Sequence, residues 1–227
     1  MRKTETGAPR RWRRIASWAA SLAVGFYVLL TAAPELLAWP HVAQHGRTRI
    51  YSNAPVPPEI DRVLARTDAL LSRSPIDRPD LERRLFLTDG GWRWSLLAPG
   101  HGGAFALRRP WRDAVIVNRS DIAGDRVENG AAIGGRRTLS GILAHELTHV
   151  LIGHRYGELR AAFFASWLVE GYADHVAQES SLSDADYRRL RADGSDHPAL
   201  DYYEGRRQVA LLLARSGGNP DALFGGD

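Results

Sequence analysis

Five polar residues in the second half of the chain have the types and spacing of a zinc site. His145, Glu146 and His149 form the pentapeptide HELTH, and Glu170 and Asp174 follow in WLVEGYADH. Residues four apart on a helix share a face, so both imidazoles can reach one metal ion while Glu146 projects beside it. A catalytic zinc ion takes three protein ligands and keeps one position open. The pattern predicts that His145, His149 and Glu170 bind one zinc ion (Zn2+).

The two remaining polar residues have supporting roles in the same prediction. Glu146 is expected to be the general base that takes a proton from an attacking water molecule. Asp174 lies one helical turn beyond Glu170 and faces the same way. It can accept the free ring N–H of a ligating histidine, a contact that fixes the tautomer and orientation of the imidazole. Together these residues predict a zinc hydrolase.

The residues around the motif strengthen this prediction. An HExxH pattern alone arises by chance in on the order of one such chain in a hundred. Here it lies in a segment with the apolar spacing of an amphipathic, largely buried helix. Two histidines and a glutamate are seldom buried without a function, so a catalytic site is favoured over a purely structural polar cluster. The apolar positions are Leu139, Ile142, Leu143, Leu147, Val150 and Leu151.

Residues 138–176, with weaker similarity to about residue 215, resemble the gluzincin, or peptidase-MA-like, zinc metallopeptidases. The resemblance implies the same three ligands, Glu146 as the base and Asp174 as the support of a histidine. It also implies a peptide substrate that lies extended along an edge strand. A tyrosine or histidine from a later segment is expected to stabilise the oxyanion.

The metzincins, a competing group, do not fit this sequence. They require a third His or Asp six residues after the second motif histidine, and a methionine turn. Position 155 is Arg155, and the only methionine is Met1. His154 is therefore predicted to be a surface or helix-end residue.

Two tyrosines are candidates for the oxyanion donor. Tyr203, or alternatively Tyr202, lies in the segment DYYEG at the start of a predicted helix. The alternative is that both tyrosines only pack this helix start against the core.

Two strand-like runs, 102–107 and 114–118, are candidates for the substrate-binding edge. Ala104, Ile116 and Asn118 are the expected contact residues, although the order of the strands is not predicted. The alternative is that both runs are ordinary sheet structure with alternating burial.

The N-terminus predicts a membrane anchor. Residues 1–14 carry six basic residues and one acidic residue and form a predicted cytoplasmic tail, and residues 15–33 carry no charge. This uncharged segment has about the length of a transmembrane helix, and Thr31-Ala32-Ala33 is a poor cleavage site. An uncleaved signal anchor is favoured over a cleaved signal peptide. The positive flank places the C-terminal domain outside the cytoplasm.

Charge and composition exclude two function classes. The net charge is +4 although the tail alone carries an excess of five positive charges, so the rest of the chain is nearly neutral. A nucleic-acid-binding function therefore has no support. The chain contains no cysteine, which excludes disulfides, thiolate ligands and cysteine nucleophiles.

The remaining pattern predicts an α+β fold, and the resemblance implies that this fold is of the zincin type. Residues 34–57 are expected to be a proline-rich juxtamembrane linker, in which Ile50 and Tyr51 could begin a short strand, and residues 58–227 a single domain. A helix over 59–71 precedes a small mixed sheet, and the segment after residue 138 is mostly helical. The strand-like runs are 84–87, 92–97, 104–107 and 114–118.

The favoured function is a membrane-anchored zinc metallopeptidase that acts on peptides or proteins. A non-catalytic adaptor that binds extended peptides on the same fold remains an alternative, as does zinc hydrolysis of a non-peptide bond. A binding protein has no chemical need for a general base, so the presence of Glu146 favours an enzyme.

Overall fold

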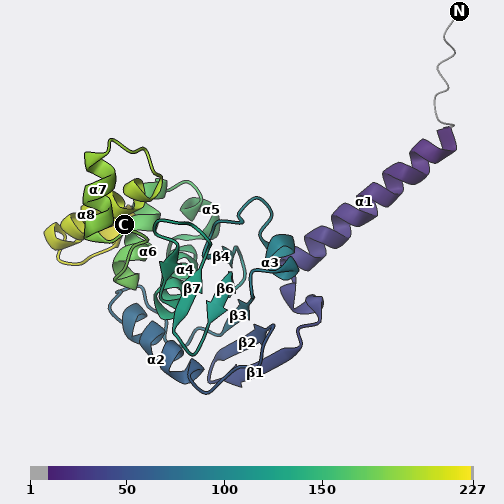
Figure 1. The fold of residues 1–227 in the computed structure, drawn as a ribbon, viewed down its shortest axis with the longest axis horizontal. Coiled ribbons are helices and arrows are strands. Elements are labelled where there is room, and N and C mark those ends of the chain that lie inside the picture. The colour runs from purple at the N-terminus through teal and green to yellow at the C-terminus, as the bar shows by residue number, and fades with distance from the viewer. Residues whose placement is uncertain (1–9, 226–227) are drawn as a thin grey trace, which may run out of the picture. The chain divides into compact units, whose positions relative to one another are not determined.

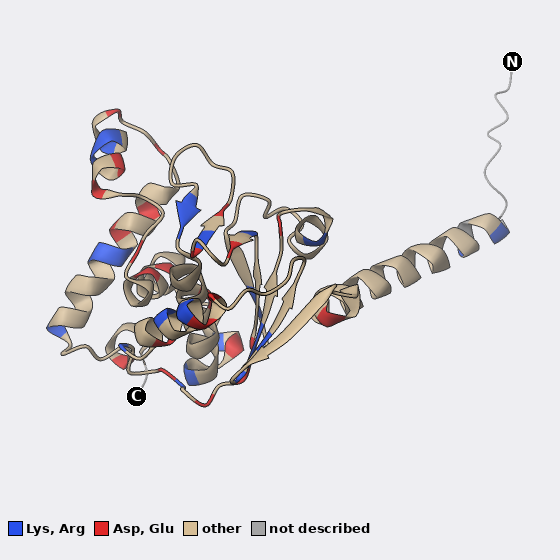
Figure 2. Ribbon diagram, turned by 60° about the horizontal axis from the view of Figure 1, so that its bottom comes forward, with Lys and Arg blue, Asp and Glu red and all other residues tan. Residues whose placement is uncertain are grey.

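The computed structural model describes residues 10–225, and the chain forms two units, residues 1–38 and residues 39–227. The first unit contains α1 (Arg10–Ala32) and the short 3-10 helix η1 (Pro34–Leu37). Figure 2 shows α1 as an almost uncharged helix beyond its first turns. Over Arg14–Ala32 it is long and apolar enough to cross a membrane, by length and composition. Residues 1–9 of the predicted cytoplasmic tail lie outside the residues that the structure describes.

A five-stranded mixed sheet organises the second unit (Figure 1). The inner pairs β2–β3 and β3–β5 are parallel, whereas the outer pairs β1–β2 and β4–β5 are antiparallel. Strand β4 therefore forms one edge of the sheet. In spatial order the strands are β1 (His41–His45), β2 (Thr48–Ser52), β3 (Arg83–Leu87), β5 (Ala114–Val117) and β4 (Ala106–Arg109).

A small antiparallel sheet leads from the main sheet to a helical region (Figure 1). Its strands are β6 (Arg119–Asp121), β7 (Arg126–Glu128) and β8 (Arg136–Arg137). The helices before and after it are α2 (Ile60–Leu71), α3 (Trp92–Leu97), α4 (Leu139–Tyr156), α5 (Glu158–Ala161), α6 (Ser166–Ala177), α7 (Asp184–Ala192), α8 (Ala199–Arg215) and α9 (Asp221–Phe224). The fold is thus mixed α+β, as the sequence predicts at that level.

Helix α4 lies at the centre of the unit. All its residues from Leu139 to Gly153 are buried, because it packs between the sheet and helices α2 and α6. It begins where the hydroxyl of Thr138 accepts the backbone N–H of Gly141 at 3.0 Å. It ends at Gly157, whose φ of 88° is easily adopted only by glycine. The prediction of a buried helix around the motif is confirmed.

Two segments differ from the sequence prediction. The expected linker contains β1 and β2, which pair with each other and with β3, so the sheet includes residues 41–52. The segment 92–97 is helix α3 and not a strand: Trp94 and Leu97, three residues apart, are buried, while Trp92 is exposed. The local pattern is weak in the first segment and does not separate a strand from a short helix in the second, so packing on the sheet decides both. The predicted helix over 59–71 is confirmed as α2.

Candidate metal centre

Three side chains from α4 and α6 converge on one point. The Nε2 atoms of His145 and His149 are 3.1 Å apart. Glu170 places one carboxylate oxygen 3.3 Å from His145 Nε2 and the other 3.5 Å from His149 Nε2. A tetrahedral zinc ion with bonds of about 2.0–2.1 Å separates its ligand atoms by roughly 3.3–3.4 Å. The three predicted ligands therefore have donor types that suit zinc, and their ligand atoms, all within 4.8 Å of one another, could hold a metal ion.

The second nitrogen of His145 is held by Asp174. Asp174 Oδ1 accepts the Nδ1–H of His145 at 2.8 Å, so the lone pair of a neutral His145 lies on Nε2 and faces His149 and Glu170. Burial alone lowers the pKa of His145, but hydrogen bonds to Asp174 and Glu170 outweigh it and raise the pKa to about 10 in the metal-free protein. The sequence expectation for the position of Asp174 agrees with this geometry.

Arg137 neutralises Asp174 from the other side. Its guanidinium lies 2.9 Å from Asp174 Oδ1 and 3.1 Å from Glu179 Oε1, and both Arg137 and Asp174 are almost fully buried. Burial raises the pKa of Asp174, but Arg137 and His145 outweigh this effect and lower that pKa. Glu179 also accepts the hydroxyl of Thr138, the N-cap of α4. The start of the motif helix and the support of its first ligand thus share one ionic network.

Glu146 lies between the metal-ligand cluster and the edge of the sheet. Its Oε2 accepts the backbone N–H of Arg108, in β4, at 2.8 Å. The side chain of Arg108 donates to both carboxylate oxygens of Glu158, at 2.9 and 2.8 Å. The predicted general base is therefore oriented by a strand that precedes it by about 40 residues in the chain.

A cleft of about 770 Å³ opens over these residues. Strand β4, the loop before it and the segment from Ala161 to Val169 contribute to its lining. Tyr202 and His197 also line the cleft. Burial, together with the negative charges of Glu170 and Asp174, raises the pKa of Tyr202, so its hydroxyl stays protonated.

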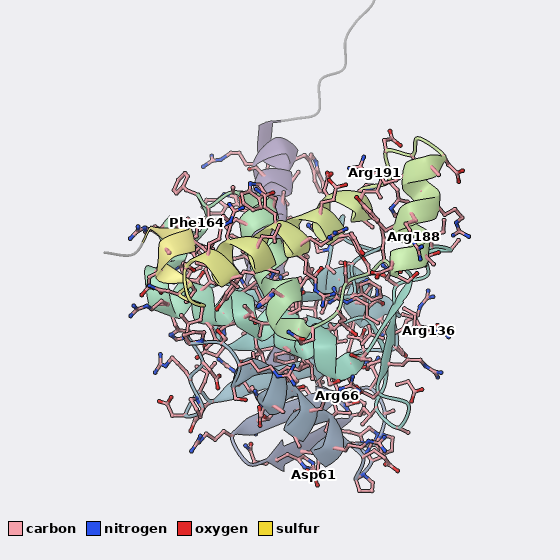
Figure 3. All side chains as sticks on the ribbon, turned by 90° about the vertical axis from the view of Figure 1, so that its left-hand side faces the viewer. Asp61, Arg66, Arg136, Phe164, Arg188 and Arg191 are labelled. Carbon is pink, nitrogen blue, oxygen red and sulfur yellow. The ribbon has the colours of Figure 1, made fainter. Side chains whose placement is uncertain are left out.

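A close helix crossing places Tyr202 beside the cluster. Helix α8 lies across α6, as Figure 3 shows. A Cβ atom at Gly171 would be 2.6 Å from the backbone of Gly205, and one at Gly205 would be 2.8 Å from the carbonyl oxygen of Trp167. Because real Cβ atoms do not approach backbone so closely, the crossing depends on both glycines.

The prediction for Tyr203 is wrong. Its ring stacks on Tyr187 at 4.2 Å, and its hydroxyl donates to Asp184 at 2.5 Å, within a separate small core. Adjacent residues of a helix point about 100° apart, so only one of the two tyrosines can face the cleft. Tyr202 is that residue.

Two of the three predicted substrate contacts are also misplaced. Ala104 lines the cleft, whereas Ile116 is fully buried in β5, an inner strand. Asn118 is buried as well, and its amide donates to the carbonyl oxygen of Ala104 at 2.8 Å. It stabilises the loop that carries Ala104. Strand order, which the sequence does not specify, decides that β4 forms the edge.

Three residues at the site were not predicted from the sequence: Arg108, Arg137 and His197. Arg108 and Arg137 act through contacts with partners far away in the chain, so no local spacing marks them. The Nδ1 of His197 accepts the backbone N–H of Ala199 at 3.2 Å, which leaves the proton of a neutral imidazole on Nε2. The closeness of His197 to Tyr202 in the sequence was the one available signal.

The structure also locates three residues to which the sequence assigned no catalytic role. His154 is a partly exposed residue in the last turn of α4, as predicted. Tyr172 is fully buried, and its hydroxyl lies 2.7 Å from that of Ser74. His101 is exposed in the loop before β4, at the rim of the cleft.

Comparisons of the chain with protein-family models, with curated proteins and with solved structures find no match.

Proposed function

We propose that this protein is a membrane-anchored zinc metallopeptidase with a zincin-like catalytic domain of the gluzincin type. The observation that carries the proposal is the convergence of His145, His149 and Glu170 on one point that could hold a metal ion, with Glu146 next to His145 in the chain. The donor set of two imidazoles and one carboxylate suits a catalytic zinc ion with an open position.

The roles of the residues follow from their contacts. A zinc ion held by the three ligands would polarise a substrate carbonyl and acidify a water molecule. Glu146 accepts the proton of the attacking water and passes it to the leaving amine. The backbone N–H of Arg108 fixes one carboxylate oxygen of Glu146, which leaves the other oxygen for this transfer.

The substrate is proposed to be a peptide in extended conformation. Strand β4 is an edge of the sheet and borders the cleft together with Ala104. An edge strand can add a further strand through main-chain hydrogen bonds, which recognise a peptide largely independently of its sequence. This geometry supports a peptide over a small non-peptide substrate.

Tyr202 and His197 are the candidates for stabilising the oxyanion. Both line the cleft, and both have a hydrogen available for donation: the phenolic hydroxyl of Tyr202 and the Nε2–H of His197. Donors that are in place before the reaction lower its barrier because they need no reorganisation as charge develops.

Helix α1 is proposed to anchor the catalytic domain to the membrane. The basic segment before it favours a cytoplasmic N-terminus and a domain on the opposite side of the membrane. The substrates would then be proteins or peptides outside the cytoplasm.

A comparison of the full-length protein with its Glu146→Gln variant tests the proposal. Both are purified in detergent, zinc is quantified by elemental analysis, and cleavage of a diverse peptide library is followed by mass spectrometry. We expect equal zinc content and cleavage only by the wild type, slowed at least 100-fold in the variant. The matched control is Glu128→Gln, a surface substitution on β7 that should leave both quantities unchanged.

The other outcomes separate the alternatives. Zinc in both proteins without cleavage by either would favour a peptide-binding adaptor or a non-peptide hydrolase. A wild-type protein that binds no zinc would contradict the assignment of the metal site.

A further inference from the structure

Glu158 is a charged side chain beside the edge strand β4, and the proposed mechanism gives it no role. It lies at the start of α5, and its side chain is only 17% exposed. It accepts two hydrogen bonds from the guanidinium of Arg108, at 2.9 and 2.8 Å. It also accepts the backbone N–H of Trp111 at 3.3 Å, in the turn between β4 and β5. One carboxylate thus holds both the edge strand and the turn that follows it.

Arg108 connects this carboxylate to the candidate base. Its side chain is bound by Glu158, and its backbone N–H donates to Glu146 at 2.8 Å. The side chain and the main chain of one residue are covalently linked, so an ion pair that holds the side chain also restrains the backbone N–H. A displacement of Arg108 therefore moves the only backbone donor that the structure shows on Glu146 among its described hydrogen bonds.

A glycine on the motif helix makes room for Glu158. Gly153 lies four residues after His149 and so on the same face of α4. A Cβ atom at Gly153 would be 2.6 Å from Glu158 Oε1 and 2.7 Å from its carboxylate carbon. Any larger residue at 153 would push the carboxylate away from its present position. The ion pair with Arg108 and the space left by Gly153 both hold the carboxylate of Glu158 in its present position.

The turn at Trp111 supports the same contact. Trp111 adopts a φ of 57°, a conformation that costs energy for a residue with a side chain. Its indole is 74% exposed, so packing of the ring does not explain the conformation. The N–H of this residue points at Glu158 instead.

We propose that Glu158 is a positioning residue for hydrolysis, which acts through Arg108 to hold β4 and thereby orient the carboxylate of Glu146. The expected effect on kcat rests on the proposed hydrolase function. The restraint of β4 by Glu158 does not depend on that function. Glu158 contacts none of the three proposed zinc ligands in the described hydrogen bonds and ion pairs, so its removal changes orientation and leaves the metal in place.

The kinetic test uses the full-length protein loaded with zinc. Glu158→Gln keeps the shape of the side chain but removes its charge, and Gly153→Ala displaces the carboxylate without altering it. We expect both variants to retain zinc and to lower kcat roughly 10- to 100-fold, because small displacements of a catalytic group are costly. KM should change less than kcat. A merely structural role would lower thermal stability and leave kcat per folded, zinc-loaded molecule unchanged, which would overturn the proposal.

A double-mutant cycle shows whether Glu158 acts through Arg108. The side-chain variant Arg108→Gln, Glu158→Gln and the double variant are compared for kcat. If the two residues form one unit, the double variant loses no more than either single variant. Independent, additive losses would contradict the proposed route. The matched control is Asp221→Asn, which breaks the ion pair of Arg155 at the C-terminal end of α4, away from the cleft, and should leave kcat unchanged.

Amide hydrogen exchange separates this inference from the proposed function. The peptide that contains residues 106–112 is followed in the wild type, Glu158→Gln, Gly153→Ala and Asp221→Asn. Faster exchange in the first two variants alone supports the restraint of β4, even if no substrate is cleaved by the wild type. Unchanged exchange in those variants would overturn the restraint, whatever the activity.

Discussion

Two histidines of α4 are each paired with a carboxylate from another part of the chain, and the two pairs differ in what surrounds them. His145 is paired with Asp174 at 2.8 Å, and His154 with Asp113 at 2.6 Å. The first pair is buried, whereas the side chains of the second are about one third exposed.

The decisive difference is the second nitrogen of each ring. His145 Nε2 faces His149 and Glu170, two further donor atoms suited to a metal ion. His154 Nδ1 instead lies 3.1 Å from the guanidinium of Arg78 and can only accept its hydrogen. A histidine held by a carboxylate thus becomes a candidate ligand only where its remaining lone pair converges with others.

The sharpest test of this comparison removes each histidine in turn. We expect His145→Ala to abolish stoichiometric zinc binding, because two ligands remain of three. His154→Ala should retain zinc fully. Elemental analysis of the purified proteins measures both. Equal zinc content in the two variants would break the comparison.

The arginine next to the buried pair should contribute more to the free energy of unfolding than the arginine next to the exposed pair. Arg137 is buried against Asp174, and its replacement by Met removes a cationic partner from both Asp174 and Glu179. We expect a loss of about 3–5 kcal/mol in the free energy of unfolding. Arg78 is 46% exposed, and Arg78→Met should cost about 0–1 kcal/mol. Urea unfolding followed by circular dichroism gives both values, and similar losses would show that burial does not distinguish the pairs.

Substitutions of Asp174 and Asp113 test whether each carboxylate affects zinc binding by the histidine that it contacts. Asp174→Asn removes the negative charge that orients His145, and we expect zinc affinity to fall roughly 10- to 100-fold. Asp113→Asn should leave the affinity unchanged. Competition with a chromogenic chelator measures the affinity. An equal effect of the two substitutions would mean that Asp174 acts only on global stability.

The metal-free protein should also show a characteristic dependence on pH. The pKa of His145 is raised from 6.5 to about 10, so the protonated form stabilises the fold below pH 6.5. This contribution is lost as the pH rises from 6.5 towards 10, with a slope of at most about 1.4 kcal/mol per pH unit. Zinc should suppress the slope because a ligating imidazole is already neutral. Denaturation midpoints with zinc and with a chelator across this pH range provide the measurement, and a metal-free slope of opposite sign would contradict it.

The elements with strong local patterns were predictable. Helix α2 and the motif helix α4 have the apolar period of amphipathic helices. Helix α2 agrees with the predicted range within one residue, and α4 begins at Leu139, the first of the apolar positions named for the motif helix. Strands β3 and β5 were also anticipated. In contrast, β1 and β2 lie in a proline-containing segment with weak periodicity, and they are strands because β3 offers an edge for pairing.

The sequence by itself determined the composition of the candidate site. Spacing along a helix places His145, Glu146 and His149 on neighbouring faces, and a second helix with Glu170 and Asp174 one turn apart can meet them. These relations depend only on helix geometry, which is local and the same in every protein. The roles in metal binding and catalysis remain predictions from that geometry.

Tertiary structure alone decided what completes the site. It selected Tyr202 over Tyr203, brought Arg137 to Asp174, and made β4 the edge strand that contacts Glu146. Each of these contacts joins residues that are 30 or more positions apart, or depends on the rotation of a helix against its neighbour. Such contacts are set by packing of the whole core, for which the local pattern of residues contains no sufficient signal.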